Sequence, residues 1–300
     1  MMIDNCTSIL HDMANALSRL LAGKLRISCS WLGITLLLLG MMCSPVTVNA
    51  QLKKGTTTPK YNAVPNSYNF LIHTPADYSP REHKSPLVIF LHGRSLCGRN
   101  LNMVKKYGVI DAIEKGKIVP AVVLAPQNPG GAWNAHKIND LINWTAKHYA
   151  IDTTRIYVLG MSLGGYGTMD FVAAYPHRVA AAMALCGGCY AKNMDGLGEV
   201  PLWIMHGTAD RAVPISESKR VVNYLKEKGK TNLLRYDWIS GGSHGLLARL
   251  FYLQQTYDWL FCHDLRQNPK EVDRNFTITQ QDLKDVYSEL KWFKDMFEYD

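Results

Sequence analysis

The 300-residue sequence lacks internal repeats, low-complexity tracts and long runs of charge. Charged residues make up 19% of the chain against 47% hydrophobic residues, which excludes a disordered or fibrous class and favours a globular enzyme. The net charge of +8 is spread along the chain rather than gathered in a basic arm. Dispersed positive charge of this kind is typical of a solvated surface, so we expect no nucleic-acid partner.

A long membrane-spanning run is also missing. The main apolar run, Trp31 to Met42, is shorter than the roughly 20 residues that a transmembrane helix needs. Basic residues precede it, and the small residues Val48 and Ala50 follow it. This order predicts a signal peptide over residues 1–50, cleaved near Ala50, and a periplasmic or extracellular mature protein without a stable membrane span. A membrane anchor is the alternative. A lipid on Cys43 is a weaker one, because the preceding residues form a poor lipobox.

Cysteine is scarce after the leader. The four cysteines beyond residue 50 are Cys97, Cys186, Cys189 and Cys262, and their disulfide pairing is left open. Cys186 and Cys189 have C-x-x-C spacing, but no second C-x-x-C completes a zinc site. We expect a local structural disulfide or free buried thiols here, and no metal.

Short apolar runs alternate with helical patterns along the rest of the chain. Expected strands lie at 69–74, 86–91, 121–125, 155–159, 180–185, 201–205 and 233–239, and expected helices at 100–115, 135–149, 164–174, 216–228 and 245–262. This alternation predicts an α/β fold with a mostly parallel central sheet and helices on both faces. We assign it to residues 67–265, after an extended lead-in over 51–66. A helical extension over 266–300 follows, in which an amphipathic helix over 282–297 docks onto the domain.

Ser162 is the candidate nucleophile. It lies at the centre of Gly160-Met-Ser-Leu-Gly164, a G-x-S-x-G motif between an apolar strand and a helical pattern. In this context the serine occupies a sharp turn, and the flanking glycines let the strand and helix approach closely. The sequence therefore predicts a serine hydrolase.

A serine hydroxyl is a weak nucleophile and needs a base oriented by a carboxylate. Asp210 and His244 follow two later expected strands, in the order serine, acid, histidine. Because the carboxyl ends of parallel strands meet at one sheet edge, we predict Asp210 as the acid and His244 as the base. Asp195, in a Gly-rich loop, and Asp237, inside an expected strand, are weaker candidates for the acid.

An oxyanion intermediate needs backbone donors. The amide of Leu163 directly follows the nucleophile, and the loop His92–Ser95 is expected to supply the second donor. We choose the amide of Arg94, with Ser95 as the alternative. The Arg94 side chain either reaches into the site, toward a substrate carboxylate or sugar hydroxyl, or points to solvent. Trp133 either binds substrate by stacking on a sugar or aromatic acyl group, or packs its loop.

Five motifs carry a family resemblance. They are Leu91-His-Gly93, Ala125-Pro-Gln-Asn128 with Trp133, Gly160-Met-Ser-Leu-Gly-Gly165, His206-Gly-Thr-Ala-Asp210 with Val213-Pro214, and Gly242-Ser-His244-Gly245. In this order they resemble the α/β-hydrolase superfamily, over roughly residues 69–264. The closest group is that of dienelactone hydrolases, phospholipase/carboxylesterases and prolyl-oligopeptidase-like secreted esterases. The resemblance implies a cofactor-free ester or amide hydrolase. Many relatives carry a second glycine where this chain has Arg94.

These observations favour a secreted serine carboxylesterase that acts through an acyl-enzyme on Ser162. No long insertion suggests a lid, so we expect an open cleft and a small-molecule or polysaccharide ester as substrate, such as an acetyl or feruloyl ester. A serine peptidase of the prolyl-oligopeptidase type is the alternative, disfavoured because no gating domain is visible. A non-catalytic binding protein is disfavoured by the complete set of catalytic residue types. The oligomeric state is left open.

Overall fold

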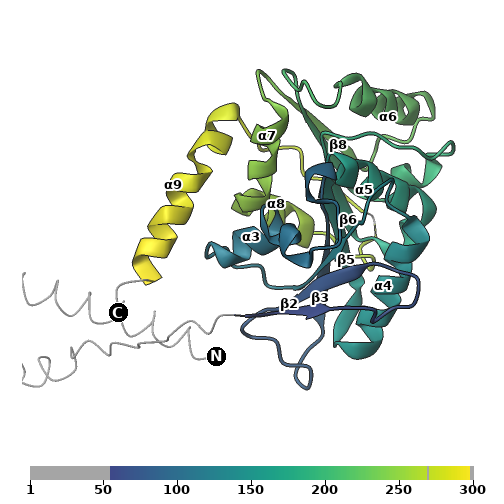
Figure 1. Ribbon diagram of the computed structural model, residues 1–300. Coiled ribbons are helices and arrows are strands. Elements are labelled where there is room, and N and C mark those ends of the chain that lie inside the picture. The colour runs from purple at the N-terminus through teal and green to yellow at the C-terminus, as the bar shows by residue number, and fades with distance from the viewer. Residues whose placement is uncertain (1–54, 269, 298–300) are drawn as a thin grey trace, which may run out of the picture. The chain divides into compact units, whose positions relative to one another are not determined.

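The computed structural model describes residues 55–268 and 270–297, and these form one eight-stranded sheet with helices on both sides (Figure 1). The strands are β1 (Thr56–Lys60), β2 (Asn69–Thr74), β3 (Ser85–Leu91), β4 (Val122–Gln127), β5 (Ile151–Met161), β6 (Ala181–Leu185), β7 (Leu202–Gly207) and β8 (Leu234–Ile239). Their order is β1-β2-β4-β3-β5-β6-β7-β8. β2 is antiparallel to both β1 and β4, and the other neighbours are parallel. The expected signal peptide lies outside the described residues.

Four strands of the sheet are buried along their whole length. Every residue of β3, β4, β6 and β7 is buried, which explains their nearly continuous apolar sequences. Side chains that alternate along a strand point to opposite faces, so Phe90 of β3 joins one core and Leu91 the other. The predicted mostly parallel sheet is confirmed.

Helices cover each face of the sheet. One core packs the sheet against α4 (Ala135–His148), α5 (Leu163–Ala174) and α6 (Ser216–Glu227). The other core packs it against α3 (Val109–Glu114), α7 (His244–Leu247) and α8 (Gln254–Phe261), together with the 3₁₀ helix η5 (Ala248–Tyr252) and α9 (Gln280–Phe297). The remaining 3₁₀ helices are η1 (Arg94–Leu96), η2 (Leu101–Lys105), η3 (Pro176–Arg178) and η4 (Asp195–Glu199).

Two expected helices are broken. The helix expected over 100–115 divides into η2 and α3 at Gly108, whose φ of 95° leaves the helical region. A side chain at Gly108 would collide with the ring of Phe90, so packing requires glycine at this position. The helix expected over 245–262 divides into α7, η5 and α8, because Leu253 is extended, with ψ 137°.

The two ends of the described chain complete the sheet and its cover. Residues 56–60 of the expected lead-in form the edge strand β1, where Pro59 is tolerated because an edge strand leaves some amides unpaired. α9 buries Leu283, Val286 and Leu290 in the core on its side of the sheet. Within the described part of the chain, no helix has both the length and the apolar character needed to cross a membrane.

Candidate active site

Ser162 lies on the turn between β5 and α5 with φ 59° and ψ −121°, a conformation that few non-glycine residues adopt. Such strain costs on the order of 1–3 kcal/mol and persists only where the surroundings impose it. The amide of Ser162 donates to the carbonyl of Leu185, at the end of β6, over 2.8 Å. A Cβ added to Gly164 would lie 1.8 Å from the Leu91 carbonyl oxygen, which explains the second glycine of the motif.

The loop after β3 lies against Ser162. A Cβ added to Gly93 would sit 3.3 Å from the Cβ of Ser162. His92 fixes this loop, because its Nδ1 bonds the Gly93 carbonyl at 2.8 Å and its Nε2 accepts from the Asn128 amide at 3.0 Å. Burial lowers the pKa of His92 to about 4, so the ring is neutral and holds both bonds at neutral pH. The Gly93 amide donates to the Tyr107 hydroxyl at 2.7 Å.

The two expected oxyanion donors follow Gly93 and Ser162 in the chain. Arg94 opens η1 directly after Gly93, and Leu163 opens α5 directly after Ser162. Within the described residues, neither amide donates a hydrogen bond to a protein acceptor. Unpaired amides of this kind suit the binding of a negatively charged oxygen. The Arg94 side chain is exposed, in line with the solvent-facing alternative.

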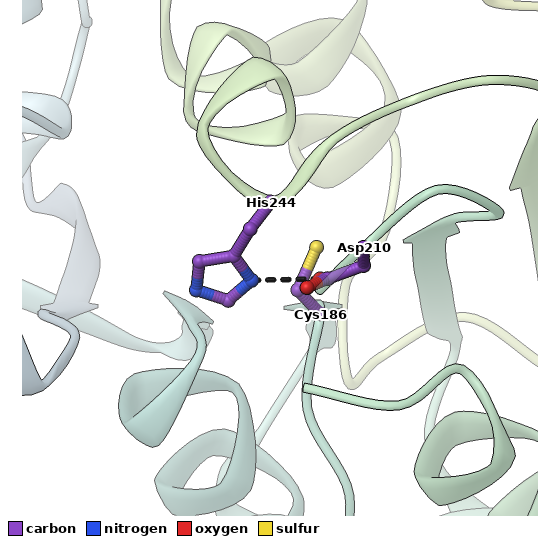
Figure 2. A group of neighbouring side chains, drawn as sticks. All are labelled: Cys186, Asp210 and His244. Carbon is purple, nitrogen blue, oxygen red and sulfur yellow. Dashed lines mark hydrogen bonds and ion pairs between the residues drawn. The ribbon is translucent and has the colours of Figure 1, made fainter. Parts of the chain in front are cut away.

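Asp210 and His244 are joined directly. His244 Nδ1 lies 2.7 Å from Asp210 Oδ2 (Figure 2). The other carboxylate oxygen, Oδ1, accepts from the amides of Ala212 at 2.8 Å and Val213 at 3.0 Å. Burial opposes ionisation of Asp210, but the amides and His244 outweigh it and lower the pKa of the carboxyl. Asp210 is therefore a fixed negative charge beside His244 at neutral pH.

The end of β6 connects this pair to the nucleophile. Leu185 accepts the bond from Ser162, and the next residue, Cys186, places its sulfur beside Asp210 and His244. The ligand atoms of Cys186, Asp210 and His244 lie within 4.8 Å of one another. No hydrogen bond joins Ser162 Oγ to His244 in the described chain; such contacts often tighten only when substrate binds.

Sequence reasoning missed the role of His206 beside the acid. Its Nε2 lies 3.0 Å from the Val213 carbonyl. The same nitrogen lies 3.3 Å from Asp210 Oδ2. Its Nδ1 lies 2.8 Å from Ser218 Oγ. Burial lowers the pKa of His206, so we treat the ring as neutral, with Nε2–H facing two acceptors. The four-residue spacing of His206 and Asp210 is the only signal in the sequence for this contact.

Cys186 was also missed as a neighbour of the acid. Its side chain is fully buried and its φ is 48°, in the left-handed region. Burial and the nearby Asp210 raise the pKa of its thiol well above the usual value. The C-x-x-C spacing allowed a local disulfide between Cys186 and Cys189. All four cysteines in the described residues are instead free thiols.

Trp133 is an interior side chain, with 5% of its surface exposed. Its ring packs edge-on against Tyr68 and His92, and its Nε1 donates to the His92 carbonyl at 3.2 Å. These contacts are those of the loop-packing alternative for Trp133.

The two weaker candidates for the acid have other partners. Asp237 binds Trp203 Nε1 at 2.6 Å and Arg235 at 2.9 Å. Asp195 accepts from the Tyr224 hydroxyl at 3.0 Å. Neither is recorded in contact with His244 among the described residues.

A cavity of about 550 Å³ opens beside the histidine. It is lined by Ala209, Arg211, Ala212, Ser243, His244 and Gly245. Arg211 is exposed and has no ion-pair partner among the described residues. The cavity reaches His244 from the solvent side, so a substrate group seated there would meet the base directly.

Comparisons with known proteins agree with this geometry. The phospholipase/carboxylesterase family matches residues 127–251. The acetylxylan esterase A of Aspergillus oryzae is 34% identical over 68 residues, 22% of each chain. A bifunctional acetylxylan esterase/xylanase of Neocallimastix patriciarum is 26% identical over 166 residues, 53% of this chain and 22% of that protein. The chain thus spans about a fifth of the length of these curated relatives.

Solved structures share the fold. A thermostable esterase superposes with a TM-score of 0.58 at 25% identity, over 71% of this chain and 64% of that one. A feruloyl esterase module from Clostridium thermocellum superposes with a TM-score of 0.53 at 15% identity, over 76% of this chain and 95% of that one. These likenesses confirm the predicted fold class.

Proposed function

We propose that the chain is a serine carboxylesterase of the α/β-hydrolase superfamily, acting through an acyl-enzyme on Ser162. The observation that carries this proposal is the 2.7 Å contact between His244 Nδ1 and Asp210 Oδ2, at the sheet edge that holds the strained Ser162. A buried carboxylate bound to one ring nitrogen leaves the other nitrogen as a base.

The acylation step follows from these positions. Asp210 accepts the Nδ1–H of His244, so the lone pair lies on Nε2. His244 Nε2 takes the proton of Ser162 as Oγ attacks the ester carbonyl carbon. The carbonyl oxygen becomes an oxyanion, which the amides of Leu163 and Arg94 bind. Asp210 stabilises the imidazolium that forms.

The alcohol then leaves to complete acylation, and water hydrolyses the acyl-enzyme. The imidazolium of His244 gives its proton to the leaving alcohol, and the carbon–oxygen bond of the ester breaks. Water then loses a proton to His244 Nε2 and attacks the acyl group on Ser162. Ser162 Oγ leaves with the proton from His244, so the free enzyme and a carboxylic acid result.

We propose an acetyl ester of a polysaccharide as the substrate. The curated relatives are named as acetylxylan esterases, and the open cavity beside His244 suits a bulky alcohol on the leaving-group side. The burial of Trp133 removes the aromatic platform expected for a feruloyl group. A small acyl group therefore fits better than an aromatic one.

A substrate panel tests the proposal. Wild type and Ser162→Ala are assayed on p-nitrophenyl acetate, acetylated xylo-oligosaccharides, methyl ferulate and peptide anilides. We expect wild type to favour acetyl esters and Ser162→Ala to lose about 10⁴-fold or more in kcat. Faster cleavage of anilides than of esters would favour a peptidase. Ligand binding without turnover, equal in wild type and Ser162→Ala, would favour a binding protein.

A further inference from the structure

A buried thiol lies beside the catalytic acid and base. Cys186 follows β6, and its left-handed φ of 48° turns the sulfur toward the contact between Asp210 and His244 (Figure 2). One ligand atom from each of the three side chains lies within 4.8 Å of the other two. Among the described residues, this is the one group of three such side chains with metal-ligand spacing. The catalytic cycle proposed above makes no use of the sulfur.

We propose that Cys186, Asp210 and His244 form an inhibitory site for a thiophilic divalent cation such as Zn²⁺, which rests on the proposed esterase function. Thiolate, imidazole and carboxylate are the three ligand types that zinc takes in proteins. Zinc-to-ligand distances of about 2.0–2.3 Å in a tetrahedral site place the ligand atoms about 3.3–3.8 Å apart. The 2.7 Å contact between His244 and Asp210 therefore opens by less than about 1.5 Å when the ion enters.

Binding of the cation moves two protons. Cys186 releases its thiol proton to solvent and binds as thiolate. The ring proton of His244 moves from Nδ1 to Nε2 as Nδ1 binds the metal, so the ring stays neutral. Asp210 binds through a carboxylate oxygen. Three protein ligands leave the fourth tetrahedral position to water.

This arrangement stops catalysis for a specific reason. The base nitrogen in the proposed cycle is Nε2, and it carries a proton once Nδ1 holds the metal. A protonated Nε2 in a neutral, metal-bound ring has no lone pair with which to accept the serine proton. Asp210 is also withdrawn from its role of orienting the ring. We expect a loss of kcat rather than a weaker affinity for substrate.

The cavity beside His244 offers the cation a route to the site. His244 lines this cavity, and its side chain is 24% exposed. Cys186 and the Asp210 side chain are fully buried, so the His244 ring turns aside to admit the ion.

Cys189 supplies a matched control. It is a second buried thiol, three residues further along the same loop. Its sulfur lies 3.3 Å from Asp170 Oδ1, and no histidine is recorded beside it in the described chain. Cys262 is the exposed thiol, so Cys262→Ser controls for binding of metal at the surface.

The first experiment measures zinc inhibition of p-nitrophenyl acetate hydrolysis in a non-chelating buffer. Each variant is normalised to its own metal-free rate. We expect wild type, Cys189→Ser and Cys262→Ser to be inhibited over the same zinc range and to recover with a chelator. Cys186→Ser should need at least about tenfold more zinc for half-inhibition. Equal zinc sensitivity of Cys186→Ser and wild type overturns the proposal, as does a wild type that millimolar zinc leaves uninhibited.

A second readout does not depend on activity. Co²⁺ is added to Ser162→Ala, which keeps the three ligands, and the near-ultraviolet thiolate-to-cobalt absorption band is recorded. We expect the band in Ser162→Ala and its loss in Ser162→Ala/Cys186→Ser. Adding Cys189→Ser or Cys262→Ser to Ser162→Ala should leave the band unchanged. Absence of the band from Ser162→Ala overturns the metal site even if Cys186→Ser fails to fold. If Ser162→Ala shows the band but wild type hydrolyses no ester, the metal site stands and the proposed function alone is refuted.

Discussion

His206 Nε2 lies 3.3 Å from Asp210 Oδ2, and neither side chain is exposed. Asp210 is therefore flanked by two histidines that differ in setting. His244 is partly exposed beside a cavity, whereas His206 is enclosed and also contacts the Val213 carbonyl. The structure thus separates a histidine suited to proton transfer from one suited to holding the acid.

We expect His206→Ala to lower both stability and turnover. The change leaves the Val213 carbonyl and one side of Asp210 without a donor, at a cost of about 1–3 kcal/mol in the free energy of unfolding. Because Asp210 then moves against His244, kcat should fall more than KM rises. Urea denaturation and steady-state kinetics on p-nitrophenyl acetate measure the two effects.

The control for His206 is His206→Gln, whose side-chain amide can still donate toward Val213 and Asp210. We expect this variant to recover part of the lost kcat. A purely packing role would instead predict that His206→Leu recovers stability and kcat together better than His206→Gln does.

Asp210→Asn should reduce kcat by about 10⁴-fold with little change in fold, because the amide holds His244 in the wrong tautomer. The pH dependence of stability provides a second test. The pKa of Asp210 is lowered in the folded chain, so its stabilising contribution is present above the unfolded pKa and is lost as pH falls through the folded value. The stability difference between wild type and Asp210→Asn should therefore shrink as the solution becomes acidic.

The buried histidines predict a separate loss of stability in mild acid. Burial lowers the pKa of both His92 and His263 to about 4. The unfolded chain therefore binds protons between about pH 6.5 and 4 that the folded chain does not, and stability falls as pH falls through this window. Because His263 Nε2 has no hydrogen-bond partner, His263→Phe should flatten the decline measured by urea denaturation. An unchanged slope in His263→Phe would contradict this assignment.

The nucleophile turn predicts a difference between two glycines. An added Cβ at Gly164 meets the Leu91 carbonyl oxygen at 1.8 Å, whereas one at Gly245 meets no atom within 4 Å. Gly164→Ala should lose about 3 kcal/mol or more of stability or fail to fold, and Gly245→Ala should stay within about 0.5 kcal/mol of wild type. Thermal melts of the two variants measure the difference. Similar melting temperatures would contradict it, because they would show that the turn relaxes around an added Cβ at Gly164.

The leader prediction is tested on protein recovered from outside the cytoplasm. We propose export with cleavage near Ala50, from the order of basic, apolar and small residues in the sequence. Intact mass and N-terminal sequencing should place Gln51 at the start of the mature chain. A protein that keeps residues 1–50 and fractionates with membranes would support the anchor instead.

The sequence was sufficient for features that depend on continuous apolar runs. β2 has the bounds expected from its sequence, and β3 and β6 differ by one residue at their start. β1 was missed as a strand because Thr, Lys and Pro give little apolar alternation, and only pairing with β2 reveals it. The break at Gly108 depends on the ring of Phe90, which is distant in sequence.

The residues of the site also divide into those that the sequence predicts and those that it does not. Ser162, Asp210 and His244 could be named from motif and chain order, and the structure brings Asp210 and His244 into direct contact. The contacts of Cys186 and His206 with the acid depend on how β6 and β7 lie side by side, and no local pattern encodes that. The burial of Trp133 depends likewise on Tyr68, directly before β2, and His92, directly after β3.

The central claim is that Ser162 forms the covalent intermediate, with His244 as its base. The direct measurement is a fluorophosphonate reaction followed by peptide mass mapping of wild type, Ser162→Ala and His244→Ala. We expect stoichiometric labelling of wild type on the peptide that contains Ser162, none on Ser162→Ala, and labelling of His244→Ala slowed by about 10³-fold or more. Labelling of another residue, or ester hydrolysis by a wild type that stays unlabelled, would contradict the account.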